Sequence, residues 1–276
     1  MTSLTLADGR TLDLSRPLIM GIINCTPDSF AVQCPTLEQA VGMARQMIAE
    51  GADILDLGGE SSRPGSMPVP SETELARVIP VIESIRGFSS IPISIDTGKA
   101  AVAEKALTAG ANIINDITAL AGDPAMAAAA VRHNCPVVLM HIKGTPKTMQ
   151  IDPRYDDVIG EVSEYFEERM NQAREQGVAE EQIILDVGIG FGKRLIDNLT
   201  LVKHLHAFAR FGRPLMVGLS RKRFIGDLTG ADASDRLPGS LAAAALAVSA
   251  GAHIIRTHDV APTKQAVAVA MAVREA

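Results

Sequence analysis

The chain of 276 residues is poor in the groups with which proteins bind nucleic acid. It has no tryptophan, and its aromatic side chains are seven phenylalanines and two tyrosines. A platform for stacked bases needs aromatic side chains, and a face that binds phosphate backbones needs a surplus of Lys and Arg. Here 32 acidic residues outnumber 26 basic ones, which gives a net charge of −6. We therefore expect no nucleic-acid partner.

Three other scarcities narrow the class of protein. The cysteines, Cys25, Cys34 and Cys135, are odd in number and lack metal-like spacing, which favours a reducing cytoplasm over a disulfide framework. The N-terminus has neither a basic start nor an apolar stretch, so we expect no signal peptide. The longest run without Asp, Glu, Lys or Arg, residues 237–255, contains a proline and two glycines. A buried helix followed by a strand explains this run better than a membrane span, so we expect no membrane partner.

What the chain does contain is a regular alternation of short apolar runs and longer alanine-rich amphipathic ones. Residues 3–14 predict a hairpin that turns at Asp8-Gly9, a favoured turn pair. The continuous apolar runs that follow are typical of parallel strands covered on both faces. The predicted strands are 18–23, 53–57, 93–95, 112–114, 136–140, 183–185, 215–217 and 253–255.

Eight strand–helix units without a linker favour one α/β domain over residues 1–276, a (β/α)8 TIM barrel. The hairpin would occupy residues 1–15 and the barrel residues 16–276. An open doubly wound sheet is the structural alternative, but the Gly-x-Gly-x-x-Gly that such sheets carry after their first strand is absent.

Helix boundaries are indicated at several places. Thr36-Leu37-Glu38-Gln39 and Ser71-Glu72-Thr73-Glu74 both match the capping box of a helix start. Gly51 and Gly110 stand where two helices are expected to stop.

Polar side chains follow every predicted strand, at the end where barrel enzymes build their active sites. Each residue alone has an ordinary explanation: Asn and Asp are common in turns and caps, and a single histidine is commonly structural. Acids and cations recurring at matching positions are better explained by a shared site. The strand-end residues are Asn24, Glu60 to Arg63, Asp96, Asn115-Asp116, His141, Asp186, Ser220 to Lys222, and Arg256 to Asp259.

The residue types in this set indicate the ligand. Asp96, Asn115 and Asp186 offer acceptors that suit the donor edge of a planar, nitrogen-rich heterocycle. Cationic donors suit the oxygens of a phosphate or diphosphate. The predicted cationic donors are Arg63, Lys222, Arg256 and His258.

Hydrolytic motifs are missing, since neither Gly-x-Ser-x-Gly nor His-Glu-x-x-His occurs. Residues 188–193 are similar to a phosphate-binding loop, but Arg194 stands where Ser or Thr should follow. We interpret this segment as a tight turn after the sixth barrel strand.

At the level of motifs the chain resembles the bacterial dihydropteroate synthases. The most specific segments are Thr26-Pro27-Asp28-Ser29-Phe30 and Gly58-Gly59-Glu60-Ser61-Ser62-Arg63-Pro64-Gly65. Ser220-Arg221-Lys222 and Arg256-Thr257-His258-Asp259 add to them, and the matching segments span residues 20–260 in family order. The resemblance implies a transferase of folate biosynthesis and a target of sulfonamides. Its reaction condenses 6-hydroxymethyl-7,8-dihydropterin diphosphate with p-aminobenzoate and releases diphosphate, with Mg2+ as cofactor.

The resemblance also implies roles for particular residues. The pterin would be held by Asp96, Asn115, Met140, Asp186 and Lys222, with Arg256 along the ring. Arg256 and His258 would meet the diphosphate beside Ser62 and Arg63, and Lys222, Arg256 and His258 would be the catalytic group. Asn24 would be the protein ligand to Mg2+. The p-aminobenzoate subsite would comprise Phe30, Pro64, Phe191 and Ser220, and we expect a cytoplasmic homodimer.

Two alternatives stay open at this point. A pterin-binding methyltransferase domain shares the barrel and its acceptors but releases no diphosphate, which the cationic set argues against. A catalytically idle paralogue that binds pterin is favoured by one departure from the family pattern: after Phe30 the chain has Ala31-Val32-Gln33-Cys34 in place of Ser-Asp-Gly-Gly.

Overall fold

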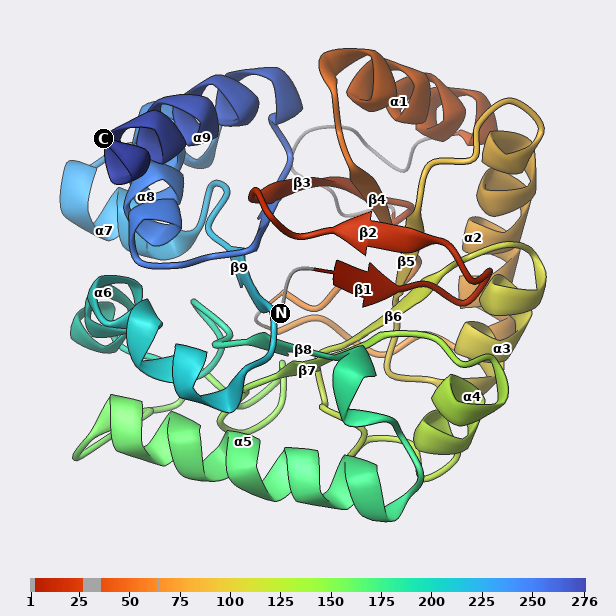
Figure 1. Cartoon of the computed structure of the whole chain (residues 1–276), viewed down its shortest axis with the longest axis horizontal. Coiled ribbons are helices and arrows are strands. Elements are labelled where there is room, and N and C mark those ends of the chain that lie inside the picture. The colour runs from red at the N-terminus through yellow and green to blue at the C-terminus, as the bar shows by residue number, and fades with distance from the viewer. Residues whose placement is uncertain (1–2, 27–35, 64) are drawn as a thin grey trace.

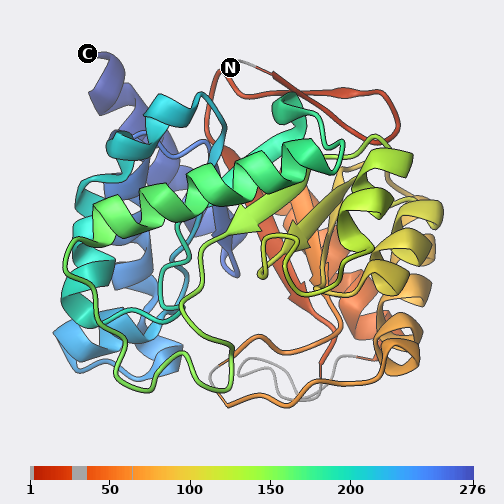
Figure 2. The same cartoon turned by 90° about the horizontal axis from the view of Figure 1, so that it is seen from below.

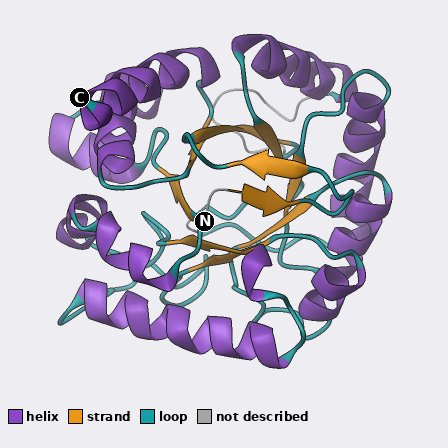
Figure 3. Cartoon of the chain, in the orientation of Figure 1, coloured by secondary structure: helices purple, strands orange, loops and turns teal. Residues whose placement is uncertain are grey.

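Parallel strands closed into a barrel form the centre of the protein in a computed structural model that describes residues 3–26, 36–63 and 65–276. The strands follow one another around the barrel in chain order, and the last pairs with the first. Figure 3 shows the ring of strands surrounded by helices. The barrel strands are β3 (Leu18–Asn24), β4 (Ile54–Gly58), β5 (Ile93–Asp96), β6 (Ile113–Asp116), β7 (Val137–Met140), β8 (Ile183–Asp186), β9 (Leu215–Gly218) and β10 (Ile254–Thr257). The predicted TIM barrel is confirmed.

Helices cover the outside of the barrel along its whole circumference (Figure 1). Short 3-10 turns lie at Glu180–Gln182, Leu205–Phe211 and Ala233–Asp235. The α-helices are α1 (Leu37–Glu50), α2 (Ser71–Arg86), α3 (Ala100–Thr108), α4 (Met126–Arg132), α5 (Val158–Glu175), α6 (Leu195–Lys203), α7 (Arg223–Thr229), α8 (Leu237–Ser249) and α9 (Val260–Glu275). Within the described ranges, none of these helices has the length and apolar character needed to cross a bilayer.

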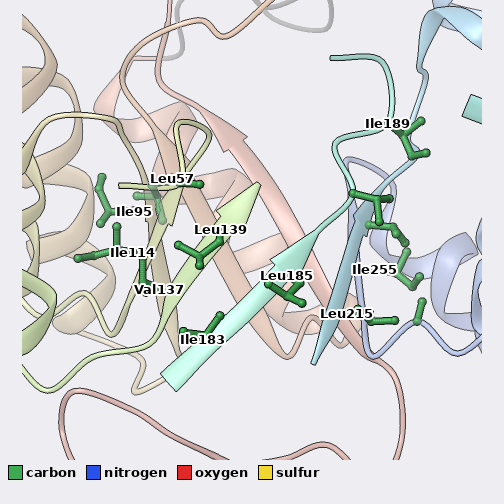
Figure 4. Close-up of a cluster of buried hydrophobic side chains, with 14 of the residues drawn as sticks. Leu57, Ile95, Ile114, Val137, Leu139, Ile183, Leu185, Ile189, Leu215 and Ile255 are labelled. Carbon is green, nitrogen blue, oxygen red and sulfur yellow. The ribbon is translucent and has the colours of Figure 1, made fainter. Parts of the chain in front are cut away.

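Side chains alternate between the two faces of each barrel strand, so the buried apolar residues form two clusters. Outward-facing side chains pack beneath the helices in the larger cluster, part of which is drawn in Figure 4. Leu57, Ile95 and Ile114 belong to it. Inward-facing side chains such as Ile54, Ile113 and Ile184 fill the amino-terminal part of the barrel. Because successive strand residues alternate faces, the residue two positions after each inward one also points inward, but nearer the carboxyl end.

The N-terminal hairpin closes the amino-terminal end of the barrel. Strands β1 (Ser3–Thr5) and β2 (Thr11–Asp13) pair antiparallel, and Leu4 and Leu6 pack into the inward-facing cluster. In Figure 2 the hairpin lies at the top, and the loops after β4 and β7 lie at the opposite end. The plug leaves the carboxyl end as the mouth of the barrel.

The sequence signals for helix boundaries are confirmed in part. Thr36 caps α1 in a complete capping box with Gln39, and Gly51 ends that helix in the left-handed conformation, as predicted. The capping box at Ser71 is wrong, because Ser71 is already helical and Pro70 is the N-cap. The fourth residue of that motif, Glu74, instead turns inward to Lys99, with 2.6 Å between its Oε2 and Nζ. A half-buried lysine thus takes the carboxylate that the pattern assigned to the helix start.

Candidate active site at the carboxyl end of the barrel

The polar residues predicted to follow the strands are mostly their last members. Asp96, Asn115 and Asp186 end or nearly end β5, β6 and β8, so β5 and β8 run one residue further than predicted and β6 runs two. Parallel neighbours continue the hydrogen-bond ladder through these positions, for example between Asp96 and Asn115. Their side chains therefore point from rigid strands into the mouth, two positions beyond the apolar inward layer.

An ion-pair network spans the mouth from β10. Arg256 Nε lies 2.6 Å from Asp56 Oδ2, and Arg256 Nη2 lies 2.7 Å from Asp96 Oδ2. Asn115 donates to the same Asp56 carboxylate at 3.2 Å. The two carboxylates raise the pKa of Arg256 although burial opposes this. The network brings three predicted site residues together.

Asp56 is a member of this network that the sequence interpretation missed. It is fully buried in the middle of β4, between Leu55 and Leu57. The available signal was a carboxylate inside an apolar strand, since a buried charge requires a partner. The interpretation considered only strand ends, and Asp56 stands two residues before one.

Asp116 is a predicted strand-end acid that does not join the other site residues. The strand alternation turns it away from Asn115, and its carboxylate accepts from Thr118 and from the Leu120 backbone in the following turn. Asp116 thus has the turn role that is usual for such residues, and it lies outside the mouth.

Asp186 and Lys222 form the opposite wall. Burial raises the pKa of Asp186, while Lys222, Arg256 and Lys193 lower it, and its Oδ1 accepts from the Gly188 amide at 2.8 Å. Burial lowers the pKa of Lys222 to about 8, so this amine stays mostly protonated at neutral pH. Met140 lies beside Asp186 in the strand register and is buried.

Lys222 also contacts Phe191, a member of the predicted p-aminobenzoate subsite. Its ammonium lies 4.3 Å from the centre of the Phe191 ring, which belongs to the turn after β8. Ser220 lies two residues before Lys222, in the turn after β9. Phe30 and Pro64, the other predicted members of this subsite, lie outside the residues that the structure describes.

A hydrogen-bond chain joins Ser220, His258 and Asn24. His258 Nδ1 lies 3.0 Å from Ser220 Oγ, and its Nε2 lies 3.5 Å from Asn24 Nδ2. These partners assign the proton to Nδ1, which donates to the serine, and leave Nε2 to accept from the amide. The amide oxygen of Asn24 is then the atom left for a ligand.

The predicted cationic character of His258 is not supported. Burial, together with Arg256, Arg221 and Arg63, lowers its pKa to about 3, so the imidazole is neutral at neutral pH. Arg63 lies close enough to His258 to lower its pKa, so the loop after β4 lies at the same end of the mouth as His258. That loop also carries half-buried Ser62.

Two further groups of ionisable residues surround this mouth. Lys99 joins Glu60 at 2.5 Å to Glu74 at 2.6 Å, which fastens the loop after β4 to α2. Arg221, whose backbone φ is +55°, makes a two-point contact with Asp259. Among the described residues, no group of three His, Cys, Asp or Glu side chains is arranged to hold a metal ion.

A barrel mouth in which buried acceptors lie beside lysine and arginine side chains fits a pterin-binding barrel enzyme, and the comparisons with known proteins agree. A family model described as "Pterin binding enzyme" matches residues 20–258. The chain is 49% identical over 265 residues to dihydropteroate synthase from Escherichia coli strain K12, which covers 95% of this chain and 94% of that one. It is 45% identical to the enzyme of the same name from Synechocystis, over 92% of this chain and 89% of that one.

Solved structures give the same result. A Yersinia pestis dihydropteroate synthase in complex with a sulfonamide drug superposes with a TM-score of 0.95 at 43% identity, over 99% of both chains. A Xanthomonas albilineans dihydropteroate synthase with 4-aminobenzoic acid superposes with a TM-score of 0.92 at 44% identity, over 100% of this chain and 99% of that one. The chain belongs to the dihydropteroate synthase family, the transferases of folate biosynthesis.

Proposed function

We propose that this transferase joins 6-hydroxymethyl-7,8-dihydropterin diphosphate to p-aminobenzoate by dissociative substitution at the barrel mouth. The observation that carries the proposal is the inward layer at the carboxyl end, where Asp96, Asn115 and Asp186 lie with Lys222 and Arg256. Xanthomonas albilineans dihydropteroate synthases bind 4-aminobenzoic acid in one solved structure and 7,8-dihydropteroate in another, which supports the same arylamine substrate and the same product here.

The hydrogen-bond acceptors of the mouth suit the pterin ring. Asp186 is buried, so a hydrogen bond from a ring N–H to its carboxylate gains strength in the dry site. Asp96 and Asn115 supply further acceptors, and the Met140 side chain supplies an apolar surface. The guanidinium of Arg256, held by Asp56 and Asp96, forms a flat cationic edge beside the ring.

The bond that breaks joins the pterin methylene carbon to a diphosphate oxygen. Negative charge grows on the departing diphosphate, which Arg63, Arg256 and Lys222 stabilise, and Ser62 adds a hydroxyl donor. His258 is neutral before the diphosphate arrives; the anion raises its pKa and favours uptake of a proton. The pterin ring delocalises the positive charge that is left on the methylene.

The new bond forms between the methylene carbon and the amine nitrogen of p-aminobenzoate, which then loses a proton to solvent. Phe191 and Ser220 line the approach from the Lys222 side, and Phe30 and Pro64 stay predicted members of this subsite. The neutral arylamine is already a nucleophile, so the proposed reaction needs no strong general base.

Mg2+ is part of the proposal, and Asn24 would hold it. When bound, the ion neutralises charge on the diphosphate and polarises the bond to its leaving oxygen. The fit depends on donor chemistry: Mg2+ prefers oxygen ligands and takes few from protein, with water and phosphate supplying the rest. Asn24 presents one amide oxygen while its nitrogen faces His258.

The substitution Asn24→Ala tests this assignment. We expect a higher Mg2+ requirement for turnover, with pterin binding in the absence of Mg2+ unchanged, because the substitution removes the proposed metal ligand and a 3.5 Å contact to His258 but no proposed contact to the pterin ring. The measurement is the Mg2+ activation curve of the variant beside wild type. An unaltered curve would contradict the role of Asn24.

Diphosphate release tests the function as a whole. We expect release that depends on both the pterin diphosphate and p-aminobenzoate in the presence of Mg2+. A methyltransferase or an idle pterin-binding paralogue would release none. Binding of pterin without release would therefore overturn the proposed reaction.

The assembly and compartment are also proposed. The apolar groove over α6, α7 and α8, of about 630 Å3, is lined by Phe224, Leu228 and Leu246 among others, and the two leucines are more than half exposed. A second copy of this chain would bury these side chains. The proposed compartment is the cytoplasm, where the buried thiol of Cys135 would stay reduced.

A further inference from the structure

Lys193 is a buried lysine behind the mouth to which the proposed reaction assigns no role. It follows the turn after β8, and only 4% of its surface is exposed. Its ammonium has three acceptors: His141 Nδ1 at 2.8 Å, the Phe191 carbonyl at 3.0 Å and the His141 carbonyl at 3.3 Å. The ammonium has three protons, so these acceptors match its donors in number.

The acceptors lie on two strand ends that both carry site residues. His141 follows β7, and its ring packs edge-on against Tyr165 with 4.8 Å between centroids. Burial and Lys193 lower the pKa of His141 to about 2, so the imidazole is neutral and Nδ1 accepts. The contacts of Lys193 therefore tie the turn after β8 to the end of β7.

That turn contains Phe191 of the predicted p-aminobenzoate subsite and contacts Asp186 of the predicted pterin subsite. Its first glycine, Gly188, donates its amide to Asp186, and Phe191 lies beneath the ammonium of Lys222. A displacement of the turn would move the Asp186 carboxylate and the Phe191 ring together.

Lys193 also acts on Asp186 through its charge. The charged groups that influence Lys193 are Asp186 and Asp197, which favour its protonation, and Lys222 and Lys143, which oppose it. Burial outweighs them and lowers the pKa of Lys193 to about 7, so the amine is protonated on the acid side of neutrality. In the same pH range it opposes protonation of Asp186.

We propose that Lys193 is a positioning residue: it fixes the turn that presents Phe191, and it keeps Asp186 ionised for the pterin. A purely structural role would not need a charge there, because an apolar side chain of similar size fills a buried site without the cost of desolvation. The proposal rests on the proposed function, since it concerns the binding of the pterin diphosphate.

The test uses Lys193→Met, which removes charge and hydrogen bonds, and Lys193→Gln, which removes charge but keeps a donor. Tyr155→Phe is the matched control, because the Tyr155 hydroxyl donates to Gly192 in the same turn at 2.7 Å and contributes no charge. Pterin diphosphate affinity is measured by calorimetry across pH, and KM for p-aminobenzoate is measured with kcat. Thermal unfolding followed by circular dichroism shows which variants fold; Lys193→Gln carries the test if Lys193→Met does not fold.

Both Lys193 variants are expected to bind the pterin diphosphate about tenfold more weakly on the acid side of neutrality, where Lys193 is protonated, which is the effect of one lost charge contact. Their affinity should begin to fall at a higher pH on acidification than that of wild type, because Asp186 takes up its proton sooner. Tyr155→Phe should keep the wild-type pH profile, and Lys193→Met should raise KM for p-aminobenzoate more than it lowers kcat.

Unchanged affinity in both Lys193 variants would overturn the proposal, and so would a loss that is equal at every pH and matched by Tyr155→Phe. Wild-type protein separates this failure from a broader one. If wild type binds no pterin diphosphate, the proposed function itself is wrong; if it binds and the variants bind equally well, only the role of Lys193 is wrong.

Discussion

Asp186 illustrates how a single residue in this mouth combines a structural and a functional contact. One carboxylate oxygen accepts from the Gly188 amide, which builds the turn after β8. Burial makes the charge costly and raises the pKa of Asp186, and nearby Lys222, Arg256 and Lys193 offset only part of this rise. A carboxylate maintained at this cost is best explained by a ligand that supplies strong donors.

Replacing Asp186 by Asn retains the shape and the acceptor for Gly188 but removes the charge. We expect pterin affinity to fall about 10- to 100-fold, because a hydrogen bond to a charged acceptor is worth about 1.5–3 kcal/mol. Titration calorimetry with the pterin diphosphate measures this. Asp116→Asn is the control: it changes a buried strand-end acid that serves a turn outside the mouth. Equal affinity of Asp186→Asn and wild type would contradict the assignment.

At the scale of elements, the turns at strand ends depend on glycines with left-handed backbones. Gly192 has a φ of +63°, and a Cβ on it would come within 2.4 Å of the Lys143 carbonyl. Two loops thus approach each other at a point where no side chain fits. This close approach explains the Gly-rich segment, which is a tight turn as predicted, with positive φ at Gly188, Gly190 and Gly192.

We expect Gly192→Ala to lower the free energy of unfolding by about 2 kcal/mol or more, since backbone strain adds to the clash. Gly230→Ala is the matched variant: its φ is +72°, but a Cβ there would meet nothing within 4 Å. It should cost only the strain, about 1–2 kcal/mol. Urea unfolding of both variants measures the difference, and equal losses would contradict the close approach as the cause.

At the scale of the whole molecule, different parts of the barrel carry different features. The hairpin plugs one end, the polar mouth occupies the other, and the outer helices carry the apolar groove of α6, α7 and α8. Leu228 and Leu246 are 54% and 63% exposed there. Large exposed apolar side chains gathered in one groove favour an interface.

Leu246→Glu is expected to convert a dimer of this chain to a monomer, because the carboxylate would be buried without a partner at the interface. Light scattering coupled to gel filtration gives the mass of each species. Val273→Glu on α9 is the control, because Val273 is also exposed, at 71%, and lies outside the groove. A wild-type monomer, or a Leu246→Glu dimer, would count against this interface.

The sequence by itself determined the barrel, the N-terminal hairpin and most of the mouth. Apolar runs of the right length and spacing predict parallel strands, and the ends of such strands must meet at one edge, so Asp96, Asn115, Asp186 and Arg256 were placed near one another before any fold was known. These inferences depend only on local periodicity and on the topology that it implies.

Only the tertiary structure decided which polar side chains share the mouth and in what charge state. Asp56 on β4 joins Arg256 on β10, with β3 between their strands, Glu74 leaves a predicted cap for Lys99, and Asp116 serves a turn. His258 is neutral because it is buried beside several arginines. Partner choice and pKa depend on distances and burial between residues far apart in the chain, which no local pattern contains.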